Sequence, residues 1–242
     1  MKILGIDSSG LTASVALVED EITVAEYTVD YKKTHSQTLL PMLDEIIKMT
    51  QQDMNEIDGI AISQGPGSFT GLRIGSATSK GLAQALRKPI IPVDTLAAMA
   101  AGVYTADMLI CPLMDARRNQ TYTGLYQYEK KEQMLALSCL QAPCAVPVEA
   151  ILEKINTLKR EVIFLGDGVP VFKEQIKQMC SVAFYFAPAY CNRQRAAVVA
   201  TLGQRYYKEG KIQTPAEHAP VYLRLSQAER ERKETEEKLH AE

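Results

Sequence analysis

The chain has 242 residues, of which 46% are hydrophobic and 23% are charged, and its net charge is −2. This length fits one or two domains, and this balance is that of an ordinary soluble globular protein rather than of one with a broad basic surface for nucleic acid. No apolar run approaches the roughly 20 residues of a membrane span, and the first residues do not form a signal peptide. Five cysteines without a Cys-x-x-Cys pattern indicate neither a disulfide framework nor a zinc site. We therefore expect a cytoplasmic protein with reduced thiols.

The first half of the chain predicts the element order β-β-β-α-β-α-β-α. The first three strands follow one another too closely for crossover connections, so they should form an antiparallel meander. The first helix begins at Ser36, and its apolar positions recur at helical spacing. We expect strands at 3–7, 13–18, 22–29, 58–63 and 89–93, and further helices at 72–86 and at 96–104, the latter capped by Thr95.

The second half predicts the same element order again, although the two halves have negligible sequence identity. From Ser226 onward nearly every residue is charged, which predicts a solvated or frayed helical tail. The expected strands of this half cover 109–114, 121–128, 134–140, 162–165 and 182–186, and the helices cover 148–158, 170–179 and 194–207.

The stretch GPGSFTGLRIG, residues 65–75, joins a buried strand to the second helix. Its glycines predict that another group approaches the backbone closely. A phosphate is one candidate, because glycine-rich loops that open helices bind anions. However, Leu72 stands where a P-loop needs lysine, and Thr70 replaces the third glycine of a dinucleotide fingerprint. Asp94, after the next strand, matches only the ribose-binding acid of that fingerprint.

The other candidate for the close approach is a helix. Gly71, Gly75 and Thr78 share one helical face, and small residues on one face let two helices approach. Each interior glycine costs about 1 kcal/mol against alanine, so this face requires a packing reason. It packs either on the sheet of its own domain or against a partner chain.

The glycine-rich stretch and four further strings together resemble a known family. The chain begins with ILGIDSS, continues with HSQTLLPML, and carries MDARRNQTY in its middle and PVYLR near its end. In these strings the sequence closely resembles the TsaB (YeaZ) family, the dimerisation subunits of the bacterial machinery that makes threonylcarbamoyladenosine on tRNA. The match spans almost the whole chain.

The resemblance implies an α/β fold of two ribonuclease-H-like domains, as in the actin, sugar-kinase and Hsp70 superfamily. Each domain is expected to hold a mixed sheet in the order βββαβαβα. We place a partner-binding domain at 1–106, a second domain at 107–222 and a charged tail at 223–242. The helix at 194–207 should pack back on the first domain.

In that superfamily the turn after the first strand holds a phosphate and a metal, so Asp7, Ser8 and Ser9 are expected to form a vestigial nucleotide site. The plain alternative is a turn in which Asp and Ser bond local backbone. The counterpart in the second half is the run 115–118, where Arg117 and Arg118 replace small residues that would let a phosphate come close. A complete ATP site is therefore not expected.

His35 is the one residue that points to a metal, because the catalytic TsaD relatives carry a His-x-x-x-His pair here. Position 31 is Tyr31, so the second histidine is missing, and iron or zinc needs three or four ligands. Neither Gly-x-Ser-x-Gly nor His-Glu-x-x-His occurs, which disfavours a hydrolase. We expect His35 to serve in capping or packing.

The resemblance therefore implies a non-catalytic subunit that pairs with a TsaD catalytic subunit and a TsaE ATPase. It would have no cofactor of its own, with ATP and a metal on the partner subunits. Alone it would form a homodimer, it would meet tRNA only through the complex, and it would not contact a membrane. Two alternatives stay open: a stand-alone actin-fold ATPase or kinase, and a glycoprotease-like metallopeptidase.

The expected partner surface combines the first two helices. Met42, Ile46 and Met49 widen the apolar band of the first helix, which predicts burial on two sides, and methionine adapts to more than one partner. The residues expected at this surface are His35, Leu39, Met42, Leu43, Ile46, Phe69, Gly71, Arg73, Gly75 and Thr78.

Overall fold

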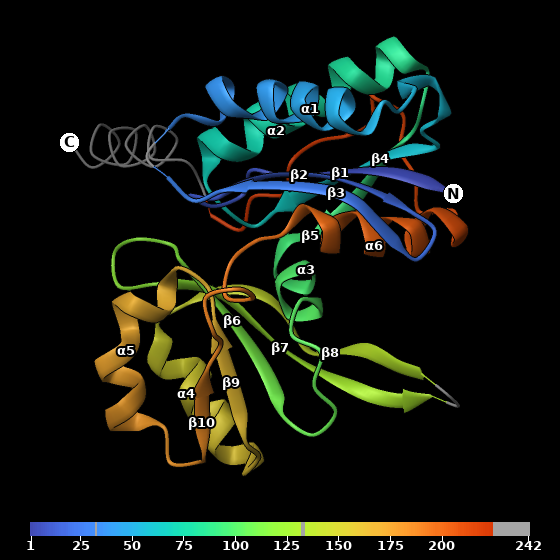
Figure 1. Ribbon diagram of the computed structural model, residues 1–242. Coiled ribbons are helices and arrows are strands. Elements are labelled where there is room, and N and C mark those ends of the chain that lie inside the picture. The colour runs from blue at the N-terminus through green and yellow to red at the C-terminus, as the bar shows by residue number, and fades with distance from the viewer. Residues whose placement is uncertain (32, 132–133, 225–242) are drawn as a thin grey trace, which may run out of the picture.

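A computed structural model describes residues 1–31, 33–131 and 134–224. The two halves of the chain form two lobes, each built on one five-stranded sheet (Figure 1). Nearly all of the expected charged tail, residues 225–242, lies outside the described residues. No described helix is long and apolar enough to cross a membrane.

The first lobe holds a mixed sheet in the order β3-β2-β1-β4-β5. Strands β1 to β3 form the antiparallel meander that the short connections predict, and β4 and β5 join β1 in parallel. Its elements are β1 (Lys2–Asp7), β2 (Ala13–Glu19), β3 (Ile22–Val29), α1 (His35–Thr50), a 3₁₀ turn (Met54–Glu56), β4 (Gly59–Gly65), α2 (Phe69–Leu86), β5 (Ile90–Asp94) and α3 (Thr95–Ala101).

The second lobe repeats this topology in the order β8-β7-β6-β9-β10. The predicted order βββαβαβα therefore occurs twice, which confirms the pair of ribonuclease-H-like units. Its elements are β6 (Leu109–Asp115), β7 (Thr121–Lys131), β8 (Met134–Val146), α4 (Val148–Leu158), β9 (Val162–Leu165), α5 (Gly168–Met179), β10 (Phe184–Phe186) and α6 (Ala196–Lys208).

Helices cover both faces of each sheet (Figure 1). In the first lobe α1 and α2 lie on one face and α6 lies on the other. In the second lobe α4 and α5 pack on one face, and α3 packs on the other between the two lobes. The core of each lobe is therefore split into two layers by its sheet.

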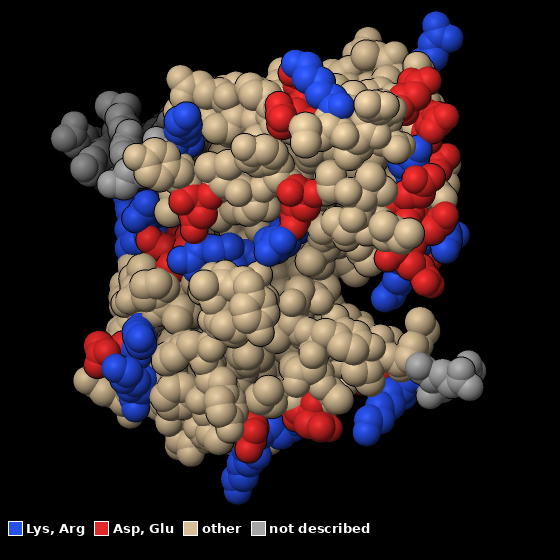
Figure 2. Space-filling view, in the orientation of Figure 1, with Lys and Arg blue, Asp and Glu red and all other residues tan. Residues whose placement is uncertain are grey.

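Helix α6 packs on the first sheet although it follows the second lobe in the chain. A Cβ at Gly5 of β1 would overlap the backbone of Ala196, and Ala200 lies on the same side, so only glycine lets strand and helix approach this closely. Glu26 of β3 fixes the start of α6, because its carboxylate accepts a hydrogen bond from the Ala197 amide at 3.0 Å and pairs with Arg195. Figure 2 shows charged side chains of both signs along the line where the lobes meet.

Several element ends differ from the expected ones for local reasons. Helix α2 begins at Phe69 rather than at 72, because the Ser68 hydroxyl accepts from the Gly71 amide and caps the helix one turn earlier. Asp94, not Thr95, caps α3, and Thr95 is buried inside the first turn. Strand β8 continues to Val146 because it pairs with β7 along its whole length.

Candidate functional site

The glycine-rich loop between β4 and α2 contacts two segments of its own chain. The Ser68 amide donates to the Ser9 carbonyl at 2.7 Å, and a Cβ at Gly67 would overlap that same carbonyl. Gly65 has a φ of +126°, and a Cβ there would overlap the carbonyl of Val221. The groups that approach these two glycines are therefore the β1–β2 turn and the C-terminal segment, and neither a phosphate nor a partner helix is needed to explain them.

Two of the three glycines of α2, Gly71 and Gly75, face inward. The Ser8 hydroxyl donates to the Gly71 carbonyl at 2.8 Å, and a Cβ at Gly75 would overlap that hydroxyl. Both glycines are buried, and Thr78 is half-buried. The prediction that this glycine face meets a partner is wrong for Gly71 and Gly75, because the face packs on the β1–β2 turn of the same chain.

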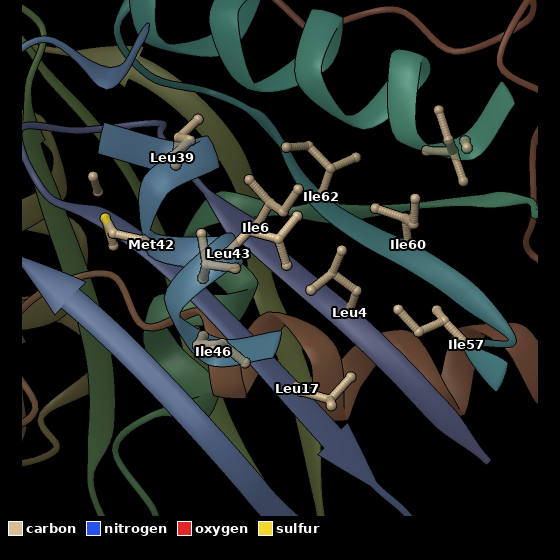
Figure 3. Packing of buried hydrophobic residues seen from close by; sticks show 14 residues of the cluster. Leu4, Ile6, Leu17, Leu39, Met42, Leu43, Ile46, Ile57, Ile60 and Ile62 are labelled. Carbon is tan, nitrogen blue, oxygen red and sulfur yellow. The ribbon is translucent and has the colours of Figure 1, made fainter. Parts of the chain in front are cut away.

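The apolar front of α1 also faces inward (Figure 3). Leu39, Met42, Leu43 and Ile46 are 2%, 5%, 6% and 3% exposed, and they pack with Leu4, Ile6 and Ile62 of the sheet. The prediction that Met42 and Ile46 lie on a second, partner-facing flank is therefore wrong. Met49 is 76% exposed and Leu40 is 53% exposed, and because they are nine residues apart they lie on opposite flanks of the buried front of α1.

Asp7 lies beneath the β1–β2 turn. One carboxylate oxygen accepts from the Ser9 amide at 2.9 Å and the Ser9 hydroxyl at 2.7 Å, and the other accepts from the Ser63 hydroxyl. Burial raises the pKa of Asp7, and these hydrogen bonds oppose the rise. The carboxylate is thus engaged with its own turn and does not fit a role as ligand of a metal–nucleotide complex in the cleft.

His35 is the first residue of α1, and its Nε2 lies 2.9 Å from the Gly10 carbonyl. It therefore ties α1 to the β1–β2 turn, as the packing prediction requires. His218 is buried, and its Nδ1 lies 3.1 Å from Gln213 Oε1. Within residues 1–31, 33–131 and 134–224 no group of three His, Cys, Asp or Glu side chains lies close enough to hold a metal ion.

A cleft of about 700 Å³ lies between the lobes. The first lobe contributes Ser9, Gly10 and the start of α2, and the second contributes Arg117, Arg118 and Asp167. The expected halves of a nucleotide site do face each other across this cleft, but Asp7 and Ser8 do not line it. Ser9 is the one member of that expected trio that does.

The C-terminal segment completes the wall of this cleft, and sequence reasoning did not assign it a role. Tyr222 stacks on Phe69 with ring centroids 4.2 Å apart, and the Arg73 guanidinium lies over the Phe69 ring. Arg224 then crosses to the second lobe and donates to the carbonyls of Ala116 and Arg117. The string PVYLR is the sequence signal that could have indicated this role, because its aromatic and basic residues are not typical of an apolar core.

Asp94 caps α3 and does not lie in the cleft. Its carboxylate accepts from the Ala97 amide at 2.7 Å and the Tyr126 hydroxyl at 3.4 Å. Burial raises the pKa of Asp94 from 3.8 to about 6. The side chain is engaged within the fold, so the fingerprint role in dinucleotide binding has no support.

Comparison with known proteins points to one family. The family model described as "TsaD: tRNA N6-adenosine threonylcarbamoyltransferase" matches residues 24–232. The tRNA threonylcarbamoyladenosine biosynthesis protein TsaB of Bacillus subtilis is 34% identical over 95% of this chain and 96% of that protein. The TsaB of Escherichia coli is 30% identical over 93% and 95%.

Solved structures give the same result for the fold. YeaZ from Pseudomonas aeruginosa is 25% identical and superimposes with a TM-score of 0.76 over 92% of this chain and 99% of that one. A second structure, of a protein from the same organism described as similar to peptidase YEAZ, gives a TM-score of 0.77 at 26% identity over the same shares.

We predict that Gly75→Leu destabilises the chain. The leucine must displace Ser8 and Ile62, and overpacking of this kind costs about 1–3 kcal/mol. Thermal unfolding of the purified chain should show a lower melting temperature. An unchanged or higher melting temperature would contradict inward packing and would indicate that this face of α2 meets a partner.

We predict that Asp94→Asn stabilises the chain more at pH 7.5 than at pH 5. The folded-state pKa of Asp94 lies above its unfolded value, so its contribution to the free energy of unfolding is fully present below pH 4 and is lost as the pH rises through 6. A rise of about two in pKa corresponds to roughly 3 kcal/mol, and asparagine caps a helix as well as aspartate does.

Urea unfolding of wild type and variant at both pH values measures this difference. Asp94→Ala is the control that removes the cap, and it should lose stability relative to Asp94→Asn by about 0.5–2 kcal/mol. Parallel pH profiles for wild type and Asp94→Asn would show that the carboxyl group is not perturbed.

Proposed function

The chain belongs to the TsaB (YeaZ) family, and on this premise we propose that it is the non-catalytic partner of a TsaD-like transferase in the formation of threonylcarbamoyladenosine on tRNA. Two relatives that match this chain over nearly their whole length are named as biosynthesis proteins for this nucleoside. The observation that carries the non-catalytic role is the engagement of Asp7, Ser8 and Ser9 within the fold.

Those internal hydrogen bonds occupy the groups that an actin-fold ATPase or kinase would use to bind its nucleotide. The Asp7 carboxylate accepts from Ser9 and Ser63, and the Ser8 hydroxyl donates to Gly71. A nucleotide could use them only by breaking buried hydrogen bonds, and each unsatisfied group would cost about 1–3 kcal/mol. ATP and a metal are therefore assigned to the partner subunits, and a TsaE-like ATPase completes the assembly.

The metallopeptidase alternative has no geometric support in the described residues. His35 is bound to the Gly10 carbonyl, and His218 lies beside Gln213. The word peptidase in the description of one structural neighbour refers to that protein.

The surface proposed for the partner is the outer face of α1 and α2, which lie side by side above the first sheet (Figure 1). We define this outer helix face by Leu40, Arg73, Ala77 and Gly81, all of them exposed. A Cβ at Gly81 would meet nothing within 4 Å, so a partner helix can approach closely there. Ala77 lies one turn before Gly81, and Leu40 supplies an apolar contact 53% exposed.

We predict that Gly81→Leu separates pairing from stability. The glycine costs the helix roughly 0.8–1.0 kcal/mol against alanine, and the added side chain has open space, so the melting temperature of the chain alone should stay or rise. The same side chain should block close approach and abolish pairing with a TsaD-like subunit from the same organism.

Light scattering after size exclusion measures the pairing, with Gly81→Ala as the control that adds helix propensity and little bulk. The inward-facing Gly75→Leu gives the opposite pattern for the chain alone, a loss of stability. A Gly81→Leu variant that still forms the full complex would show that the partner binds elsewhere.

We also predict that the purified chain alone neither hydrolyses ATP nor modifies tRNA. Threonylcarbamoyladenosine should form when a TsaD-like subunit, a TsaE-like ATPase and the activated threonylcarbamoyl donor are added, and mass spectrometry of digested tRNA detects it. ATP turnover by the chain alone that disappears in Asp7→Ala would contradict the subunit role.

A further inference from the structure

The cleft between the lobes gathers three arginines on one wall. Arg117 and Arg118 project from the turn between β6 and β7, and Arg224 comes from the C-terminal segment. Arg224 donates to the carbonyls of Ala116 and Arg117, so it braces this turn. Arg118 is exposed and has no ion-pair partner among the described residues.

The turn that presents these arginines has an unusual backbone. Arg117, Arg118 and Asn119 have φ values of 62°, 55° and 55°, three left-handed residues in succession without a glycine. Residues in this conformation are strained, and they persist where the surroundings fix them. Here Asp115 fixes the first of them, Arg117, by accepting from its amide at 2.8 Å and pairing with its guanidinium at 3.0 Å.

The opposite wall also favours a negative charge. It holds the N-terminus of α2, an 18-residue helix, at Ser68, Phe69 and Thr70. A helix N-terminus carries partial positive charge, and it faces the arginines across the cleft. Two acids lie in the cleft: Asp115 pairs with Arg117, and burial raises the pKa of the Asp167 carboxyl.

An aromatic stack stands beside the arginines. Tyr222 and Phe69 are parallel within 3°, the Arg73 guanidinium lies 5.7 Å from the Phe69 ring centroid, and Arg73 Nε donates to the Tyr222 hydroxyl at 3.4 Å. Tyr222 keeps 37% of its surface exposed although one ring face rests on Phe69. Nucleic-acid bases stack on such rings, whereas an acidic peptide has no use for them.

We propose that this cleft and the Tyr222 ring beside it bind an unpaired segment of RNA, with phosphodiester groups at Arg118 and Arg224 in the cleft and a base on Tyr222, which stacks on the cleft residue Phe69. A cleft of about 700 Å³ admits a backbone and a base but no duplex. Guanidinium groups bind phosphate oxygens in a bidentate way. The proposal rests on the assignment of the chain to a tRNA-modifying assembly, and it differs from the expectation that tRNA meets this chain only through its partners.

The test measures fluorescence anisotropy of a labelled tRNA transcript and a labelled single-stranded RNA with the full chain. Arg118→Asn removes one charge and keeps a residue that tolerates the left-handed conformation. It should weaken binding at least fivefold and lower the slope of log K against log salt by about 1. Lys154→Asn, the same charge change on the exposed side of α4, should leave both unchanged.

Three outcomes would overturn the proposal. One is equal RNA affinity of wild type and Arg118→Asn, or an equal loss in the Lys154→Asn control. Another is displacement of bound RNA by ATP from the wild type but not from Arg118→Asn. That result would identify the cleft as a nucleotide site. The third is binding of a polyglutamate peptide that Arg118→Asn abolishes while RNA binding stays, which would identify an acidic partner.

Pairing with the TsaD-like subunit, measured on the same variants, separates this proposal from the proposed function. Arg118→Asn should pair like wild type, because Arg118 lies in the cleft and not on the outer helix face. A wild-type chain that does not pair but binds RNA through Arg118 would sink the subunit role and support the site. A chain that pairs and shows no Arg118-dependent RNA binding would support the subunit role and contradict the RNA site.

Discussion

The close approach of α2 to the β1–β2 turn is the contact on which the rest of the first lobe depends. Ser8 fills the space that Gly71 and Gly75 leave, and its hydroxyl bonds the helix backbone. Since this contact fixes α2 on the sheet, it also fixes α1 beside it and turns the outer helix face to solvent. The same contact engages Ser8, and Asp7 beneath the turn is engaged by Ser9 and Ser63. One packing solution therefore both leaves the outer helix face open to solvent and engages Asp7 and Ser8 in internal hydrogen bonds.

The topology was readable from the sequence because it rests on local patterns. Alternation and helical spacing located all ten strands and six helices of the described residues, and the repeated order indicated two related units. The directions in which the side chains of α1 and α2 point were less readable. Spacing places Gly71 and Gly75 on one face of α2, but which face is buried depends on Ser8, 63 residues earlier in the chain than Gly71. The same applies to Met42, whose burial depends on the sheet beneath it.

The cleft shows a second limit of sequence reasoning. The run 115–118 could be recognised as the counterpart of the first turn, and its arginines as a departure from small residues. Arg224 could not be assigned to the cleft, because 106 residues separate Arg118 from Arg224 and only the path of the C-terminal segment brings them together. The same path places Tyr222 against the cleft residue Phe69. Long-range juxtaposition of this kind leaves no periodic trace in the sequence.

The position of α6 in the chain determines which lobe can finish folding first during synthesis. The first sheet uses residues up to Asp94, yet the face that holds Ile3, Ala61 and Val93 stays open until α6, residues 196–208, has been synthesised. The second lobe is continuous in the chain from Leu109 to Phe186, so it can form first. The amino-terminal sheet must then wait with an apolar face exposed, and its closure over more than 100 intervening residues should be the slow step. A truncation that removes α6 would therefore harm the beginning of the protein more than its end.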